Sequence, residues 1–423
     1  MAVTPDFKVF VDDVMVKDLK GNDLANVGAL RTRISIGDLL DGKIHLEKVE
    51  LRDVDANLVQ YEGEDKFNFA FLAEAFPSDT TKESKPMPII IDKISLKNVD
   101  FVMWNQSKSD SLKTANHLMD YAHLDLDNVN LEATDFYMFG DSIHANIASL
   151  NAKEWSGLEL KSFMADATVT QKGIFLDDML METNNSRFDL DLNMLYNGFD
   201  DFQYFVDSVV FDATIRPTDV MLSDIGVFSN VMYKMPDKVL FEGKFTGPIE
   251  HFRVDDIKAE LGKSTSFQGS ISMHPLNFEN GYHTLNIKDM HFTYDDLVNF
   301  YIPSSTKTIP LPESLRPMNE GRINLDFQGS YNNFTSDISL LSDIGDIDAS
   351  IARAKDLKGD NVFSGYVNAQ RVKAGTVANA SKFVGDLDLN ADFTARFPRK
   401  GSPEIRSMVW LLMRNCLATI SMK

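Results

Sequence analysis

The sequence is poor in the residues and segments on which several classes of protein depend. Its 423 residues contain one cysteine, Cys416, which excludes an internal disulfide framework and a cysteine-based zinc site. No run approaches the roughly 18 apolar residues of a membrane-spanning helix. The first residues, 1–8, lack the basic and apolar segments of a signal peptide. We therefore expect a soluble chain that carries no membrane anchor.

Positive charge is scarce relative to negative charge. Lys and Arg total 42 against 63 Asp and Glu, which gives a formal net charge of -21 at pH 7. Such a chain repels nucleic acid and anionic membrane surfaces, so we expect no nucleic-acid partner. Because 43% of the residues are hydrophobic, an ordinary share for a folded protein, the acidity belongs to a solvated surface and not to a disordered chain.

Catalytic and cofactor-binding signatures are missing as well. The sequence contains no Gly-x-Ser-x-Gly, P-loop or Gly-x-Gly-x-x-Gly motif, and its eight His residues form no metal-binding helix motif. Asp53 and Glu64 have the spacing of an EF-hand loop, but Leu58 stands where that loop requires Gly. We expect no enzymatic activity, no catalytic residue, no cofactor and no resident metal.

A strand pattern recurs along the whole chain. Residues 322–329 (Arg-Ile-Asn-Leu-Asp-Phe-Gln-Gly) and 385–393 (Gly-Asp-Leu-Asp-Leu-Asn-Ala-Asp-Phe) alternate apolar residues with Asp, Asn or other polar residues. Since successive strand side chains point to opposite faces, each run predicts a strand with one apolar and one polar face. Repetition over some 400 residues predicts a mainly β protein built as a long two-faced sheet.

The local elements follow from the same pattern and its breaks. Apolar alternation over residues 7–11 resumes at Val14 after Asp12 and Asp13, and residues 30–40 form a further run. A one-residue slip at Glu47 and Lys48 indicates a β-bulge in the next strand. Further strands are predicted at residues 89–104, 123–131, 143–150, 162–170 and 188–194. Short helices are predicted at residues 67–76, 219–230 and 294–301, each beside a proline.

An internal repeat organises the second half. The run around Gly247 matches the run around Gly329, 82 residues later, and each leads into a further strand. Such a unit cannot bury its apolar face alone and is expected to stack on its neighbours. We predict the following organisation: a β segment with a short helix (1–77), a linker (78–88), a β segment (89–216), a helix plus β repeat (217–303), a second β repeat (304–400) and an aberrant tail (401–423).

Three runs resemble a known family. Residues 41–58 (Asp-Gly-Lys-Ile-His-Leu-Glu-Lys-Val-Glu-Leu-Arg-Asp-Val-Asp-Ala-Asn-Leu), 65–69 (Asp-Lys-Phe-Asn-Phe) and 88–101 follow one another in an order similar to that of the AsmA-like family. The later helix and Gly-marked sheet units resemble the repeats of TamB-type translocation and assembly module proteins. The resemblance covers residues 7 to about 397, in the N-terminal to middle portion of such proteins.

The resemblance implies an elongated, partly open β-groove, a β-taco-like repeat sheet with a hydrophobic interior and a few short helices. It also implies a non-enzymatic role in envelope biogenesis in the periplasm of a Gram-negative bacterium. Members of the family are anchored in the inner membrane. They carry phospholipid toward the outer membrane or support outer-membrane protein assembly with a β-barrel partner. The sequence lacks the family's N-terminal anchor and its long C-terminal remainder.

On this interpretation phospholipid acyl chains lie along inward-facing apolar residues. The residues predicted to line the groove are Phe188, Leu190, Leu192, Ile323, Leu325, Phe327, Leu387, Leu389 and Phe393. Alternation alone favours a dry β-sandwich core closed by the same side chains, and only the family resemblance favours a groove. A structural or adhesive β-repeat scaffold with a closed core is therefore the alternative function. A polysaccharide-processing β-helix enzyme is less consistent, because the Asp residues are dispersed by the strand period.

The last segment departs from the pattern and generates a prediction about the gene. Residues 408–420 (Met-Val-Trp-Leu-Leu-Met-Arg-Asn-Cys-Leu-Ala-Thr-Ile) match no other strand of the chain. Reading their codons in a shifted frame restores apolar residues alternating with acidic or small ones. We predict a frameshift near residues 402–408, which resequencing of the DNA is expected to reveal as a slipped base. An in-frame continuation without that base would instead leave a genuine apolar C-terminal strand.

Overall fold

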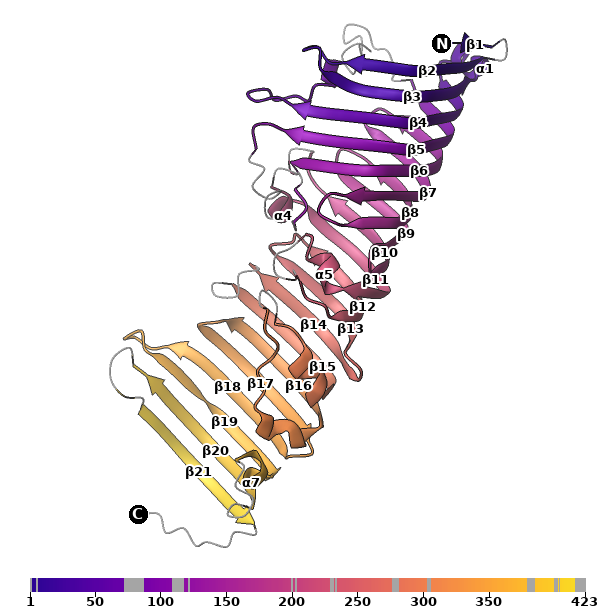
Figure 1. Ribbon diagram of the computed structural model, residues 1–423. Helices are drawn as coiled ribbons and strands as arrows, with labels where there is room; N and C mark the ends of the chain where they lie inside the picture. Colours follow the sequence, from indigo (N-terminus) through magenta and orange to yellow (C-terminus); the bar gives the residue numbers. More distant parts are fainter. Residues whose placement is uncertain are drawn as a thin grey trace. The chain divides into compact units, whose positions relative to one another are not determined.

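The computed structural model describes residues 2–4, 7–71, 87–108, 118–120, 122–198, 201, 204–228, 232, 234–275, 281–302, 306–378, 385–398, 402 and 404–414. The protein is mainly β, with open sheet and a few short helices, which confirms the predicted fold class. It divides into two compact units. The strands and helices of both are labelled in Figure 1. The N-terminal unit comprises Met1–Gln203 and Thr218–Pro236, and the C-terminal unit comprises Tyr204–Pro217 and Asp237–Lys423.

The N-terminal unit is a sheet whose strands follow chain order. They are β1 (Ala2–Val3), β2 (Lys8–Lys17), β3 (Asp23–Ile34), β4 (Ile44–Gln60), β5 (Ile89–Asn105), β6 (His123–Phe139), β7 (Ser142–Glu154), β8 (Glu159–Val169), β9 (Gly173–Glu182) and β10 (Arg187–Leu195). Each strand pairs antiparallel with the next, except that β4 and β5 are parallel. Short helices α1 (Ile36–Leu40) and α5 (Leu222–Ile225) also belong to this unit. Strand β11 (Val210–Met221) is divided in sequence between the two units.

The C-terminal unit is an antiparallel meander. Its strands are β12 (Lys238–Gly247), β13 (Phe252–Leu261), β14 (Thr265–His274), β15 (Tyr282–Thr293), β16 (Glu320–Ser330), β17 (Asn333–Ser342), β18 (Asp346–Lys355), β19 (Asn361–Val372), β20 (Asp386–Phe397) and β21 (Glu404–Arg414). From β12 to β21 every strand pairs with the next. The helical segments are α4 (Phe205–Ser208), α6 (Tyr294–Asn299), η2 (Glu313–Met318) and α7 (Ala374–Val377).

Strands β4 and β5 behave as two copies of one pattern. Ile44 pairs with Ile89, and the two strands remain in register through Gln60 and Asn105. The predicted bulge at Glu47 and Lys48 is confirmed by a register shift between β3 and β4 at this point. A second phase slip in β4 lies directly opposite its counterpart in β5. Matching slips let two long strands of similar sequence pair in parallel with their apolar residues on one face.

Bulges with a left-handed residue recur across both units. At several phase slips an Asp, Asn or Arg adopts a positive φ, a conformation that Asp and Asn tolerate better than most residues. A side-chain oxygen from the adjacent strand then accepts the backbone N–H of that residue. The donor and acceptor pairs are Asn98 to Asn130 (3.0 Å), Asn128 to Asp100 (2.8 Å), Asp178 to Asp191 (2.9 Å), Asp289 to Asn324 (2.8 Å) and Arg371 to Asp388 (2.8 Å).

The two glycine-marked runs of the repeat occupy equivalent places. Gly247 ends β12 and Gly329 lies near the end of β16, with φ of 104° and 135°. A Cβ at either position would stand only 2.4 or 2.3 Å from the carbonyl oxygen of His251 or Asn333, respectively. Only glycine therefore fits these two turns, which explains why the repeat is readable in the sequence.

Most predicted strands are confirmed, and several extend beyond their predicted ends. The prediction of strand through residues 30–40 is wrong at its end, because β3 stops at Ile34 and α1 begins at Ile36. Ser35 precedes this helix, and its hydroxyl donates to the Asp38 carboxylate (2.5 Å). This local hydrogen bond competes with continuation of the strand.

The predicted helices differ in their outcome. Helix α6 (Tyr294–Asn299) confirms the prediction for residues 294–301, apart from its last two residues. The helix predicted at 219–230 is wrong in extent, because β11 continues to Met221 and α5 covers only Leu222–Ile225; residues 229 and 230 lie outside the described residues. Half of the helix predicted at 67–76 also lies outside them; in the described half Phe67 forms a β-bridge with Gln60, and helical structure begins only at Ala70.

The tail is a strand as far as it is described. Strand β21 pairs with β20 from Glu404 to Arg414, which is compatible with a genuine C-terminal strand, and the frameshift stays a prediction. Pairing here is backbone pairing, and it accommodates a run whose sequence does not alternate. Residues 415–423, including Cys416, lie outside the described residues.

Two short helices each contain a carboxylate that accepts several hydrogen bonds from a hairpin turn. Asp296 in α6 accepts the backbone N–H groups of Lys263 (3.0 Å), Ser264 (2.9 Å) and Thr265 (3.1 Å), and the Thr265 hydroxyl (3.0 Å). Burial raises the pKa of Asp296, but these hydrogen bonds outweigh it and the pKa lies below its usual value. Asp224 in α5 holds the turn between β9 and β10 in the same way.

Replacing this carboxylate is expected to loosen the C-terminal unit. Asp296→Ala leaves several donors of the Gly262–Thr265 turn without an acceptor, so we expect a loss of about 3 kcal/mol in the free energy of unfolding. The neighbouring Asp295→Ala is the control, since Asp295 is exposed and forms only a surface ion pair with Arg316 (3.1 Å). Urea unfolding of both variants measures the difference in their free energies of unfolding. Equal midpoints would refute the stabilising role of the Asp296 carboxylate.

Acid is expected to weaken the N-terminal unit through Asp18. Burial raises the pKa of this carboxyl, but hydrogen bonds from Tyr61, Asn22, Asn68 and Lys20 together lower it from 3.8 to about 2. The carboxylate therefore stabilises the folded state above pH about 4, and this contribution is lost as the pH falls toward 2. Across this window the free energy of unfolding should fall more steeply with decreasing pH in the wild type than in Asp18→Asn. Equal pH dependence of the two proteins would contradict the stabilising role of the Asp18 carboxylate.

Candidate functional site

One face of the C-terminal unit carries rows of apolar side chains that run across the strands. The central row joins register partners from β13 to β21: Ile257, Gly269, Ile287, Leu325, Ile338, Ala349, Val367, Ala391 and Val409. Each of these residues faces the next across a strand pair, and none has a polar side chain. Directly opposed apolar residues are the unit from which a continuous apolar surface is built.

Two further rows flank the central row. The inner row consists of Met290, Ile323, Leu340, Ile347, Ala369 and Leu389. The outer row consists of Phe245, Val254, Ile271, Leu285, Phe327, Ser336, Ile351, Gly365 and Phe393. The three rows together are called the apolar face below.

Five of the predicted lining residues belong to the three rows of this face. Ile323, Leu325 and Phe327 come from β16, and Leu389 and Phe393 come from β20. Leu387 also lies on β20 and pairs with Val372. Strands β17 to β19 separate the two sets, so their members contact the same rows and not one another.

The remaining three predicted residues lie together in the N-terminal unit. Phe188, Leu190 and Leu192 of β10 pair with Met181, Met179 and Leu176 of β9. The bulge at Asp177 and Asp178 keeps Leu176 and Met179 on one face although they are three residues apart. Leu190 is buried, with 8% of its surface exposed, while Phe188 and Leu192 are only partly covered. This unit therefore carries an apolar sheet face of its own.

Burial differs sharply between the two faces of β16. Ile323, Leu325 and Phe327 are partly buried, whereas the alternating residues Arg322, Asn324, Asp326 and Gln328 are exposed. Ile257 and Ala349 are buried, and Ile257 packs in a cluster with Val254, Phe245 and Ile271 of the outer row. Most large side chains of the face thus keep part of their surface uncovered in the described residues.

Helical segments cover one end of the apolar face. Phe292, Met318 and Ile344 form a buried cluster against which Met290, Ile323 and Leu340 of the inner row pack. Leu297 of α6, Leu315 of η2 and Val377 of α7 complete it. Gly321 is required here, because a Cβ would stand 2.6 Å from the Phe292 ring. The cover reaches the inner row, and the central and outer rows have no part in this cluster.

A cation lies beyond the outer row, on the side of the apolar face away from the helical cover. Arg353 of β18 pairs by register with Phe334 and Phe363. Its guanidinium lies over the Tyr331 ring at 4.6 Å and near the Phe363 ring at 5.3 Å, and it donates to the Tyr331 carbonyl (2.8 Å). An apolar surface that ends in a held cation can accommodate a molecule with an apolar body and an anionic end.

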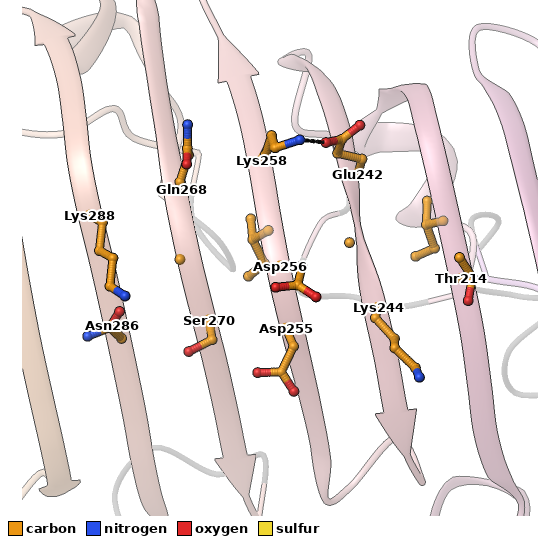
Figure 2. Close-up of a pocket in the computed structure, with 14 residues that line it drawn as sticks. Thr214, Glu242, Lys244, Asp255, Asp256, Lys258, Gln268, Ser270, Asn286 and Lys288 are labelled. Atoms are coloured by element: carbon orange, nitrogen blue, oxygen red, sulfur yellow. Dashed lines mark hydrogen bonds and ion pairs between the residues drawn. The ribbon is translucent and has the colours of Figure 1, made fainter.

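The opposite, polar face of the C-terminal unit contains a hollow of about 710 Å³ (Figure 2). Three lysines and three carboxylates line it together with neutral polar residues: Lys244, Lys258, Lys288, Glu242, Asp255 and Asp256. Lys258 pairs with Glu242, which raises the lysine pKa, and Arg253 lowers the pKa of Asp255. Both shifts favour the charged forms of Lys258 and Asp255.

Within the described residues, no group of three His, Cys, Asp or Glu side chains could hold a metal ion. No described helix is long and apolar enough to cross a membrane. The arrangement can therefore be described by its surfaces: two apolar sheet faces, one in each unit, and polar faces with shallow hollows.

Sequence reasoning missed several features of the site. Ile257, Ile287 and Ile338 belong to the central row, and their alternation with polar residues could have revealed them. Arg353 gave no signal, because a cation in an alternating strand is normally assigned to the polar face. The helical cover of the inner row depends on contacts distant in sequence and could not be inferred from alternation.

Comparison with known proteins adds no assignment. No protein family, no curated protein and no solved structure matches this chain. Its function must therefore be argued from the surfaces described above.

Proposed function

We propose that the protein is a non-enzymatic carrier whose apolar sheet faces hold the acyl chains of phospholipid. The observation that carries this proposal is the central row, which crosses β13 to β21 without a polar side chain. A surface of this kind recognises hydrocarbon and little else, because burial of apolar area is not directional. No chemical step is required of it.

The dimensions of the row suit an acyl chain. Neighbouring strands lie about 4.8 Å apart, so a row over nine strands extends for about 38 Å. One leaflet of a bilayer core is about 15 Å thick, so a single chain could lie along the row with room to move. Each methylene removed from water contributes about 0.8 kcal/mol, and successive positions along the row are nearly equivalent. A chain could thus slide without a large barrier.

The side chains of the central row favour a flexible occupant. Gly269, Ala349 and Ala391 are the small members of the row, among larger Ile, Leu and Val residues. A flexible hydrocarbon chain can follow such relief, whereas a flat second sheet would need matching large residues. Arg353 of β18 lies beside the outer row, where the anionic headgroup of a lipid could meet water.

The cellular setting of the proposal comes from the resemblance to AsmA-like and TamB-type proteins. On that basis we propose a periplasmic role between the inner and outer membranes of a Gram-negative bacterium. Phospholipid would move along the apolar faces, and an outer-membrane β-barrel would be the partner in outer-membrane protein assembly. In family members an inner-membrane anchor would hold the groove in place.

A structural or adhesive scaffold with a closed core is the second candidate. The buried cluster of Val254, Ile257 and Ala259, with Phe241 and Phe267 packed against it, is what such a core would contain. This candidate requires the rest of the apolar face to be covered by a second copy or by another protein. It predicts a protein that excludes lipid.

Site-specific photocrosslinking tests the carrier. A photoreactive phenylalanine analogue is placed at Leu325 or Leu389 on the apolar face, and at Gln328 or Asn390 on the exposed polar face of the same strands as controls. After irradiation in phospholipid-containing cells, mass spectrometry should find phospholipid adducts on the first pair only. This readout does not depend on destabilising the fold.

Charge substitutions provide a second measurement. Leu325→Asp with Leu389→Asp should reduce co-purifying phospholipid at least tenfold, because a carboxylate placed beside hydrocarbon must remain hydrated. Gln328→Asp with Asn390→Asp adds the same charge to the polar face and should retain the lipid. Adducts on both faces, or a folded wild type that is free of lipid, would overturn the carrier and favour the scaffold.

A further inference from the structure

The polar face of β2, β3 and β4 concentrates positive charge on a chain whose net charge is -21. A pocket of about 530 Å³ is lined there by Lys8, Phe10, Ala29, Arg31, Thr32, Arg33, Glu47, Lys48, Glu50 and Arg52. Five of these residues are cations and two are carboxylates. The pocket is thus locally electropositive, although the whole-chain charge predicts repulsion of anions.

Strand register produces this concentration. Lys8 pairs with Arg33, and Arg33 pairs with Lys48, so three cations lie directly opposite one another across three strands. Like charges in direct cross-strand opposition destabilise a sheet. An anion bound above these three cations would reduce their mutual repulsion. Anion binding would therefore explain an arrangement that by itself destabilises the sheet.

Neighbouring carboxylates offset part of the charge and position the cations. Arg33 Nη1 donates to Glu47 (2.9 Å), and Lys48 and Arg52 both bind Glu50. Glu50 is only 6% exposed, and its pKa is lowered chiefly by the Lys48 hydrogen bond. A buried carboxylate held ionised between two cations fixes both side chains at the pocket wall.

Arg31 is anchored more completely than the other cations. Its Nη1 donates to the carbonyl oxygens of Val11 and Leu30 (3.0 Å each), and its Nη2 binds Asp12 beside the pocket. Its guanidinium also lies 5.4 Å from the Phe10 ring. Even with Asp12 counted, five cations face three carboxylates. Arg33, Lys48 and Arg52 keep between 43% and 51% of their side-chain surface exposed and can reach a ligand.

We propose that this pocket binds a phosphate-bearing ligand. Guanidinium groups match the geometry of phosphate oxygens, and a cavity of this size lies within the range of small-molecule sites. Phe10 and the aliphatic parts of the lysine and arginine side chains add an apolar wall for the group that carries the phosphate. A phospholipid headgroup and free phosphate share this chemistry. The site is on the polar face and does not rest on the proposed acyl-chain carrier.

Calorimetric titration of the full chain tests the site with two probes. These are inorganic phosphate and dihexanoyl-phosphatidylglycerol below its micellar concentration, at low and high salt. At low salt we expect dihexanoyl-phosphatidylglycerol to bind and the affinity to fall with added salt. Arg33→Gln should weaken this binding about tenfold, as expected for loss of one charged hydrogen bond. Arg33→Lys should retain most of it.

The controls separate the possible outcomes. Arg322→Gln removes an exposed arginine from the polar face of the C-terminal unit and should leave the affinity unchanged. Competition by inorganic phosphate would support a general phosphate site, and binding of the lipid alone would support a headgroup site. Absence of binding by both probes, or equal weakening by Arg33→Gln and Arg322→Gln, would overturn the proposal. Leu325→Asp should affect lipid co-purification only, so the two proposals can fail independently.

Discussion

The fold depends on keeping apolar side chains on one face of strands that repeatedly change phase. Each slip would turn the following residues to the opposite face unless an extra residue is accommodated as a bulge. The hydrogen bond from the bulged N–H to a neighbouring Asp or Asn, as between Asp289 and Asn324, stabilises that correction. Without these bulges the rows that cross the strands would break after a few residues, and neither the apolar faces nor the opposed polar faces would be continuous.

Much of the fold could be predicted because strand alternation is local information. The sequence alone shows which residues of a strand share a face, as Ile323, Leu325 and Phe327 do on β16. The bulge at Glu47 and Lys48 was predictable for the same reason. The extent of α5 was not predictable, because Asp224 accepts hydrogen bonds from a hairpin turn some forty residues earlier in the sequence. The parallel pairing of β4 and β5 also depends on contacts beyond the range of any local pattern.

The candidate site shows where sequence reasoning reaches its limit. Alternation identifies apolar residues, but whether another layer covers them depends on the three-dimensional arrangement, as the cluster of Phe292, Met318 and Ile344 illustrates. The basic pocket was missed for a different reason. Net charge sums over the entire chain, whereas register brings Lys8, Arg33 and Lys48 together from three strands. A strongly acidic protein can therefore present a cationic surface of the size of a small ligand.

Strand pairing in the C-terminal unit is confined to sequence neighbours, and this has a consequence for cooperativity. A meander in which each strand contacts only the next transmits stability over short distances, so distant strands such as β13 and β21 can open almost independently. An acyl chain of about 15 Å lying along the central row would contact about four neighbouring strands at once. Occupancy would then couple those strands, and the occupied section of the sheet would unfold together where the empty one opens strand by strand.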